Sequence, residues 1–190
     1  YPVGSRETVA EVTVSSEKPA YGFMERRVKD PSHKLVAVEL VPPLNADDEK
    51  LLDAAHILKN AEVDVVTFPD SPSGRTRADS VLMAEKIRLE TGLCVMPHIC
   101  CRDKNAIAIR STILGASLNH ITNFLLLTGD PVPVLFRQTT KSVFNFDSVG
   151  MMKIVQEMNS DTFSEHPVTY GGGNKKKQKK KKEKKKRKTR

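Results

Sequence analysis

The sequence lacks several features that would assign it to whole classes of protein. No apolar run approaches the roughly 20 residues that a membrane-spanning helix needs, and no secretory signal precedes the first structural segment. No glycine-rich dinucleotide fingerprint is present, which disfavours a Rossmann-type dehydrogenase. There are only three cysteines, and an odd count without a signal is typical of a reducing, cytoplasmic setting.

A metal site also lacks its ligands. Cys100, Cys101 and His98 lie close together in the sequence, but all three fall in one apolar stretch that predicts a strand. Adjacent strand residues point to opposite faces, so the two cysteines are poor partners for a disulfide or a shared metal ion. No second Cys/His cluster exists, and we assign no metal.

The net charge of +8 is concentrated at one end of the chain. Residues 174–190 hold thirteen Lys or Arg and one Glu, a local charge of +12, which leaves the remaining chain at −4. Binding to nucleic acid or an anionic surface would therefore depend on this tail alone. The 190 residues suit one domain with a sizeable core.

Four apolar, largely β-branched runs each end near a polar or ionisable residue, a pattern typical of strands in a parallel α/β sheet. These runs are Leu35–Pro43, Val63–Asp70, Leu93–Cys101 and Asn123–Pro131. The segment 124–127 shows no alternation, so we expect a strand buried on both faces. Enzymes with parallel sheets place their chemistry at the carboxyl ends of such strands.

Helical patterns separate the runs. We expect a helix that starts within 45–49 with Asn45 or Asp47 as its cap, and a second over about 78–90 with a stop at Gly92. A third should run through Ile109, Ile113 and Ala116 and end near Asn119–His120, and a fourth should start at Asp147 or Ser148. Their expected inward-facing residues are Leu51, Leu52, Ala55, Leu58; Val81, Leu82, Ile87; Ile109, Ile113, Ala116; and Met151, Met152, Val155, Met158. A short leading helix at 23–27 and a weak fifth strand at 167–170 complete the expectation.

Alternation of strands and helices predicts parallel βαβ units, which form either a doubly wound sheet or a barrel. A complete (β/α)8 barrel needs about 250 residues, so this chain has room for only part of one. Periodicity alone leaves both architectures open.

Five motifs, each at a strand end or a helix start, carry a family resemblance. They are Val38–Pro43 (VELVPP), Val66–Asp70 (VTFPD), Met96–Asn105 (MPHICCRDKN), Leu127–Pro131 (LTGDP) and Val143–Val149 (VFNFDSV). Over about residues 30–172 the chain resembles methylenetetrahydrofolate reductase, in particular the bacterial subgroup found alone or fused to a homocysteine S-methyltransferase domain. The resemblance implies a partial TIM-type (β/α)8 barrel over 34–172, about the first four to five βα units. A leader at 1–33 would precede it, and a disordered Lys-rich tail would occupy 173–190.

The resemblance also implies an activity and a site. The family uses NADH or NADPH to reduce FAD, and the reduced flavin converts 5,10-methylenetetrahydrofolate to 5-methyltetrahydrofolate for methionine synthesis in the cytoplasm. Glu39 matches the general acid, a role suited to a carboxyl in an apolar strand because burial favours its protonated form. Asp130 matches the aspartate that tunes flavin and folate. The alternatives are a rim carboxylate at Glu39 and a simple turn-forming residue at Asp130.

Further residues align with the family's cofactor contacts. Thr67, His98, Thr128 and Gly129 match positions that touch the flavin, although a lone histidine is more often a satisfied core residue. Many family members have arginine where this chain has Thr128. Phe144 and Asp147 match the region that packs on and caps the ribityl and phosphate side of the cofactor.

The basic tail departs from the family, which continues beyond 172 with more strands. An adenine-rich reading frame would encode such a lysine run, so a frameshift or truncated gene is one explanation and a natural basic tail is the other. A partial barrel has an uncovered interior, so we expect a homo-oligomer or a complementing second half-barrel. Three hypotheses stay open: an active reductase, a non-catalytic remnant, and a protein that acts through its tail.

Overall fold

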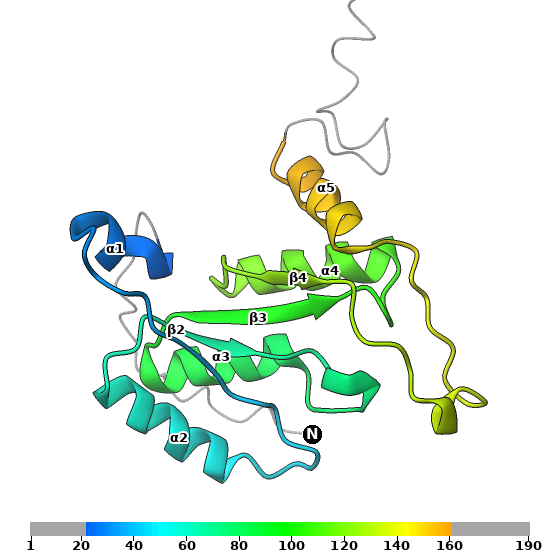
Figure 1. The fold of residues 1–190 in the computed structure, drawn as a ribbon, viewed down its shortest axis with the longest axis horizontal. Helices are drawn as coiled ribbons and strands as arrows, with labels where there is room; N and C mark the ends of the chain where they lie inside the picture. Colours follow the sequence, from blue (N-terminus) through cyan, green and yellow to red (C-terminus); the bar gives the residue numbers. More distant parts are fainter. Residues whose placement is uncertain (1–21, 161–190) are drawn as a thin grey trace, which may run out of the picture.

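The computed structural model describes residues 22–160 and shows a four-stranded parallel sheet in the order β1-β2-β3-β4 (Figure 1). The strands are β1 Ala37–Glu39, β2 Val65–Phe68, β3 Val95–Cys100 and β4 Leu125–Leu127. Each pairs in parallel with the next one along the chain. All four therefore form within the apolar runs expected to be strands.

Helices connect and follow these strands, and they succeed one another across the molecule in chain order from α2 to α5 (Figure 1). Their bounds are α1 Glu25–Lys29, α2 Glu49–Asn60, α3 Ser80–Thr91, α4 Ala106–Leu118 and α5 Ser148–Met158, with short 3₁₀ turns η1 Gly22–Met24, η2 Pro72–Gly74 and η3 Val134–Phe136. The expected leading helix is present as η1 and α1. The expected fifth strand at 167–170 and the basic tail lie outside the described residues.

Local capping signals determine most helix ends. Asp79, Asn105 and Asp147 accept hydrogen bonds from first-turn amides of α3, α4 and α5. Gly92 ends α3 in the left-handed conformation, as expected. At α2 the cap position is occupied by Asp48, without a side-chain bond, and not by Asn45 or Asp47 as expected. The Asp47 carboxylate nevertheless accepts from the amide of Glu49, the first residue of α2, at 3.2 Å.

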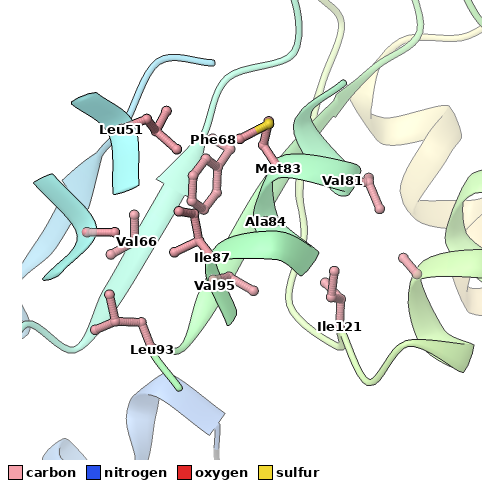
Figure 2. Packing of buried hydrophobic residues seen from close by; sticks show 12 residues of the cluster. Leu51, Val66, Phe68, Val81, Met83, Ala84, Ile87, Leu93, Val95 and Ile121 are labelled. Carbon is pink, nitrogen blue, oxygen red and sulfur yellow. The ribbon is translucent and has the colours of Figure 1, made fainter. Parts of the chain in front are cut away.

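Two apolar clusters hold the helices against the sheet. In the first, Val66 and Phe68 of β2 pack with Leu51 of α2 and Ile87 of α3 (Figure 2). The second joins Ile99 and Cys101 of β3 to α4 and α5 through Ile109, Ile113, Met151 and Ile154. The β2 and β3 residues in the two clusters alternate along their strands, so they share one face of the sheet.

The opposite face of the sheet is open in part within residues 22–160: Val65 and His98 are buried on it, but its β4 residues are not. Leu125 and Leu127 are 40% and 36% exposed, so the expectation that this strand is buried on both faces was wrong. Only Leu126, between them, packs on the helix side. Apolar residues therefore occupy both faces of this strand, although the helices cover only one of them.

Two of the expected inward-facing helix residues also point outward. Leu82 of α3 is 65% exposed and Met152 of α5 is 53% exposed. Each stands next to a residue that is buried, Val81 and Met151 respectively. A helix turns by about 100° per residue, so adjacent apolar residues cannot both face the sheet centre.

The strand order decides between the two architectures that the sequence left open. A doubly wound sheet reverses its strand order at a switch point and carries helices on both faces. Here strands are added in one direction, and the helices that pack on the sheet do so on one face. The fold is α/β, consistent with part of a TIM-type barrel. None of the helices in the described range is long and apolar enough to cross a membrane.

Candidate active site

The open face of the sheet brings three of the predicted site residues together. Glu39, the last residue of β1, lies in register with Thr67 of β2, which in turn pairs with Met96 of β3. His98 follows Met96 by two residues and therefore shares its face. The three side chains come from adjacent strands near their carboxyl ends, where parallel α/β enzymes place their chemistry.

His98 is the most constrained of these residues. It is only 6% exposed, and its Nε2 has no hydrogen-bond partner within residues 22–160. Burial lowers the pKa of His98, while the nearby carboxylates of Glu39 and Asp70 oppose that shift. At neutral pH the imidazole is neutral, and its Nε2 is a buried polar atom that has no partner among the described residues.

Glu39 does not lie in the apolar surroundings that its strand suggested. The residue is exposed because the face it occupies is not covered at β1 within the described part of the chain. Burial of its carboxyl by this segment was therefore a wrong expectation. The carboxyl is open to a ligand on this face.

The turn after β4 is tied to both neighbouring loops. Gly129 has φ +93°, and a Cβ added there would stand 2.9 Å from the Cβ of Cys100. The hydroxyl oxygen of Thr128 accepts from the amide of Ser148 at 3.1 Å. Only glycine fits this conformation and this close approach to β3, so the turn directs Asp130 to one place.

Phe144 and Asp147 lie in the segment that leads into α5. Phe144 is 39% exposed with φ +38°, a left-handed conformation that is unusual for an aromatic residue. Asp147 caps α5 by accepting from the amide of Gly150 at 2.7 Å. Its carboxylate thus has a structural role here, and its contact with a cofactor stays a prediction.

Three charged residues at the same edge were missed by the sequence reasoning about the site. Asp70 follows β2 and accepts from the Nζ of Lys104 at 2.6 Å and from the amide of Cys100 at 3.0 Å. Arg102 follows β3, and its side chain is 3% exposed. The sequence did contain a signal for them, because Asp70 lies in the motif VTFPD, Arg102 and Lys104 lie in MPHICCRDKN, and each motif extends past the end of a strand.

The cysteines offer no nucleophile or metal site. Burial and the charge of Asp70 raise the pKa of Cys100 to about 11, so its thiol stays protonated at neutral pH. Cys101 is buried in the second apolar cluster and directs its Sγ at the carbonyl oxygen of Phe146. Within residues 22–160 no group of three or more His, Cys, Asp or Glu could hold a metal ion.

Comparison with known proteins places the chain in a family. A model of the family described as methylenetetrahydrofolate reductase matches residues 24–189. No curated protein matches the sequence.

Solved structures of the carboxyl transferase domain from Rhizobium etli pyruvate carboxylase resemble the chain distantly. The domain with pyruvate has 17% identity and a TM-score of 0.38 over 70% of this chain. The same domain with oxamate and biotin has 17% identity and a TM-score of 0.37 over 64% of it. The chain spans 25% and 23% of the lengths of those two chains, and likeness at this level assigns neither fold nor function. The match over residues 24–189 does assign the family: the chain belongs to the methylenetetrahydrofolate reductases.

Proposed function

We propose that this chain contributes to the reduction of 5,10-methylenetetrahydrofolate to 5-methyltetrahydrofolate, with FAD as cofactor and NADH or NADPH as electron donor. The observation that carries the proposal is the meeting of Glu39, Thr67 and His98 on one open face, beside the Thr128–Asp130 turn. Family membership supplies the reaction, and these residues supply the groups that it needs. The product would serve methionine synthesis, and the free cysteines fit a cytoplasmic setting.

The residues present fit a flavin. The unpaired Nε2 of His98 can donate to or accept from a ring heteroatom or a ribityl hydroxyl. Beside it, the exposed side chains of Leu125 and Leu127 offer an apolar floor for a planar ring. We assign Thr67, Thr128 and Gly129 as further contacts. When bound, FAD supplies the hydride transfer, while the protein orients it and adjusts the charge around it.

Glu39 would act as the general acid. Opening of the imidazolidine ring of the folate leaves a nitrogen that must gain a proton, and a carboxyl on the open face can deliver it. His98 lies close enough for the charge of Glu39 to affect its own titration. A neutral His98 places no positive charge beside Glu39.

Asp130 would place a negative charge at the edge of the site. Its Oδ2 accepts from the amide of Ser73 at 2.7 Å, which holds the carboxylate in a defined direction. A fixed charge of this kind adjusts the electron affinity of a bound ring and orients a polar substrate. The preceding Gly129 makes this direction possible.

The test begins with the visible spectrum of the full chain after incubation with FAD and desalting. We expect a retained flavin band that NADH or NADPH bleaches and the folate substrate restores. A colourless protein would refute the proposal for this chain. The preferred donor is the nicotinamide that bleaches the band at the lower concentration.

A pair of substitutions then isolates the acid. Glu39→Gln keeps the size of the side chain but cannot donate a proton, so we expect unchanged flavin bleaching and folate turnover slower by about 10²–10⁴-fold. Glu90→Gln is the matched control, because Glu90 is exposed in the last turn of α3, away from the carboxyl ends of the strands. Equal turnover in the two variants would remove Glu39 from the mechanism.

A further inference from the structure

Arg102 joins three loops at the carboxyl edge of the sheet. Its Nη1 donates to the carbonyl oxygens of Ser71 at 3.1 Å and Asp130 at 3.3 Å. Its Nε and Nη2 bind the carboxylate of Asp103 at 2.7–3.0 Å. Its own carbonyl oxygen accepts from the amide of Val143 at 2.7 Å. A buried guanidinium with this many fixed acceptors is a connector, since arginine is the side chain that can satisfy them in one plane.

The contacts of Arg102 converge on Asp130. The guanidinium holds the carbonyl of Asp130, and the amide of Ser73 holds its carboxylate. Ser71 and Ser73 belong to one loop after β2, residues 71–74. Arg102 and Asp130 therefore each form a hydrogen bond with this loop, at different residues. The four residues thus form a closed ring of contacts between segments that are far apart in the sequence.

The loop needs such support because its backbone is in an unfavourable conformation. Ser71 and Ser73 have φ of +47° and +57°, a region that is strained for a residue with a side chain. Gly74, at φ +67°, packs so closely that an added Cβ would stand 2.8 Å from the carbonyl oxygen of Pro131. Without Arg102 the loop would relax, and the amide that orients the Asp130 carboxylate would move with it.

We propose that Arg102 is a positioning residue that aims the Asp130 carboxylate by holding residues 71–74 against the turn after β4. The proposal rests on the function assigned above, in which Asp130 acts at the site, but the ring of contacts exists without any ligand. Lys104, the nearby cation, cannot replace Arg102, because its ammonium is bound to Asp70.

The test measures hydrogen exchange of the Ser73 amide by NMR in the full chain without ligand. In Arg102→Ala we expect exchange at Ser73 to be faster by about tenfold or more, because the amide loses its fixed acceptor. The Cys100 amide, which donates to Asp70, is the internal control and should change less than about twofold. Arg110→Ala, in α4, is the matched arginine control and should leave Ser73 unchanged.

A double-mutant cycle separates positioning from general support. Asp130→Ala removes the acceptor itself, so Arg102→Ala should add nothing to it at Ser73. Arg102→Lys should restore part of the protection. Gly74→Ala leaves Arg102 in place, but its new Cβ should push residues 71–74 away from Pro131 in the segment after β4. It should therefore also accelerate exchange of the Ser73 amide. Additive effects in the cycle, an unchanged Ser73, or equal acceleration at Cys100 would each overturn the proposal.

Flavin affinity provides the link to function. If the wild-type chain binds FAD, Arg102→Ala should weaken binding or shift the flavin spectrum, and it should have no such effect in an Asp130→Ala background. A wild-type chain that binds no FAD would refute the proposed function, while the exchange measurement would still decide the role of Arg102. The two failures are therefore distinguishable.

Discussion

Replacing Gly129 by alanine should destabilise the protein through two separate effects. The first is conformational: φ +93° lies in a region that residues with a side chain rarely adopt. The second is steric, since the new Cβ would stand 2.9 Å from the Cβ of Cys100 and 3.2 Å from that of Arg102. Both neighbours belong to the segment at the end of β3, which the second apolar cluster holds in place through Ile99 and Cys101, so neither can move freely.

The magnitude follows from these two terms. Holding a residue with a side chain in such a conformation costs of order 1–3 kcal/mol. Forcing an extra methyl group into a packed site typically costs a further 1–3 kcal/mol. The free energy of unfolding should therefore fall by about 2–6 kcal/mol, a large share of the roughly 5–15 kcal/mol available to a typical domain.

Urea denaturation followed by circular dichroism measures this loss. Gly115→Ala is the matched control: among the described atoms nothing lies within 4 Å of its added Cβ, and alanine in α4 should stabilise the protein by about 0.5–1 kcal/mol. Cys100→Ala should not rescue Gly129→Ala, because the 2.9 Å contact is with the Cβ that alanine keeps. Wild-type stability in Gly129→Ala, or full rescue by Cys100→Ala, would refute the reasoning.

Two more predictions concern other parts of the chain. Asp64 is buried; burial alone raises its pKa, but the bonds it accepts from Val36 and His33, with Arg26 nearby, outweigh this and lower it. Asp64→Asn should therefore cost about 1.5–3 kcal/mol at pH 7. Because the folded-state pKa is lowered, this stabilisation is full above the unfolded value of about 3.9 and is lost as the pH falls from there through the folded-state pKa, which urea titrations at several pH values would show. A difference between the two proteins that stays constant from pH 7 down through the acid range would contradict this assignment. Deleting residues 174–190 should abolish any binding to a nucleic acid, and binding by the full chain should weaken steeply between 50 and 200 mM salt in a fluorescence anisotropy assay. Binding that survives the deletion would place the nucleic-acid site elsewhere.

The sequence by itself determined the local features of this protein. Four apolar runs became the four strands, Asp79, Asn105 and Asp147 became helix caps, and Gly92 became a helix stop. These outcomes depend on side chains that act on their own backbone within a few residues, so the local sequence contains the necessary information. The family could be recognised for a similar reason, since its motifs lie at strand ends and helix starts.

Only the tertiary structure decided how these elements assemble. The strand order distinguishes the barrel arrangement from the doubly wound one. The one-sided packing of the helices explains why Glu39, Leu125 and Leu127 are exposed. The bond from Ser73 to Asp130 spans 57 positions, and nothing in either local sequence indicates it. Contacts of this length form only when separate βα units pack side by side, so their partners depend on the fold as a whole.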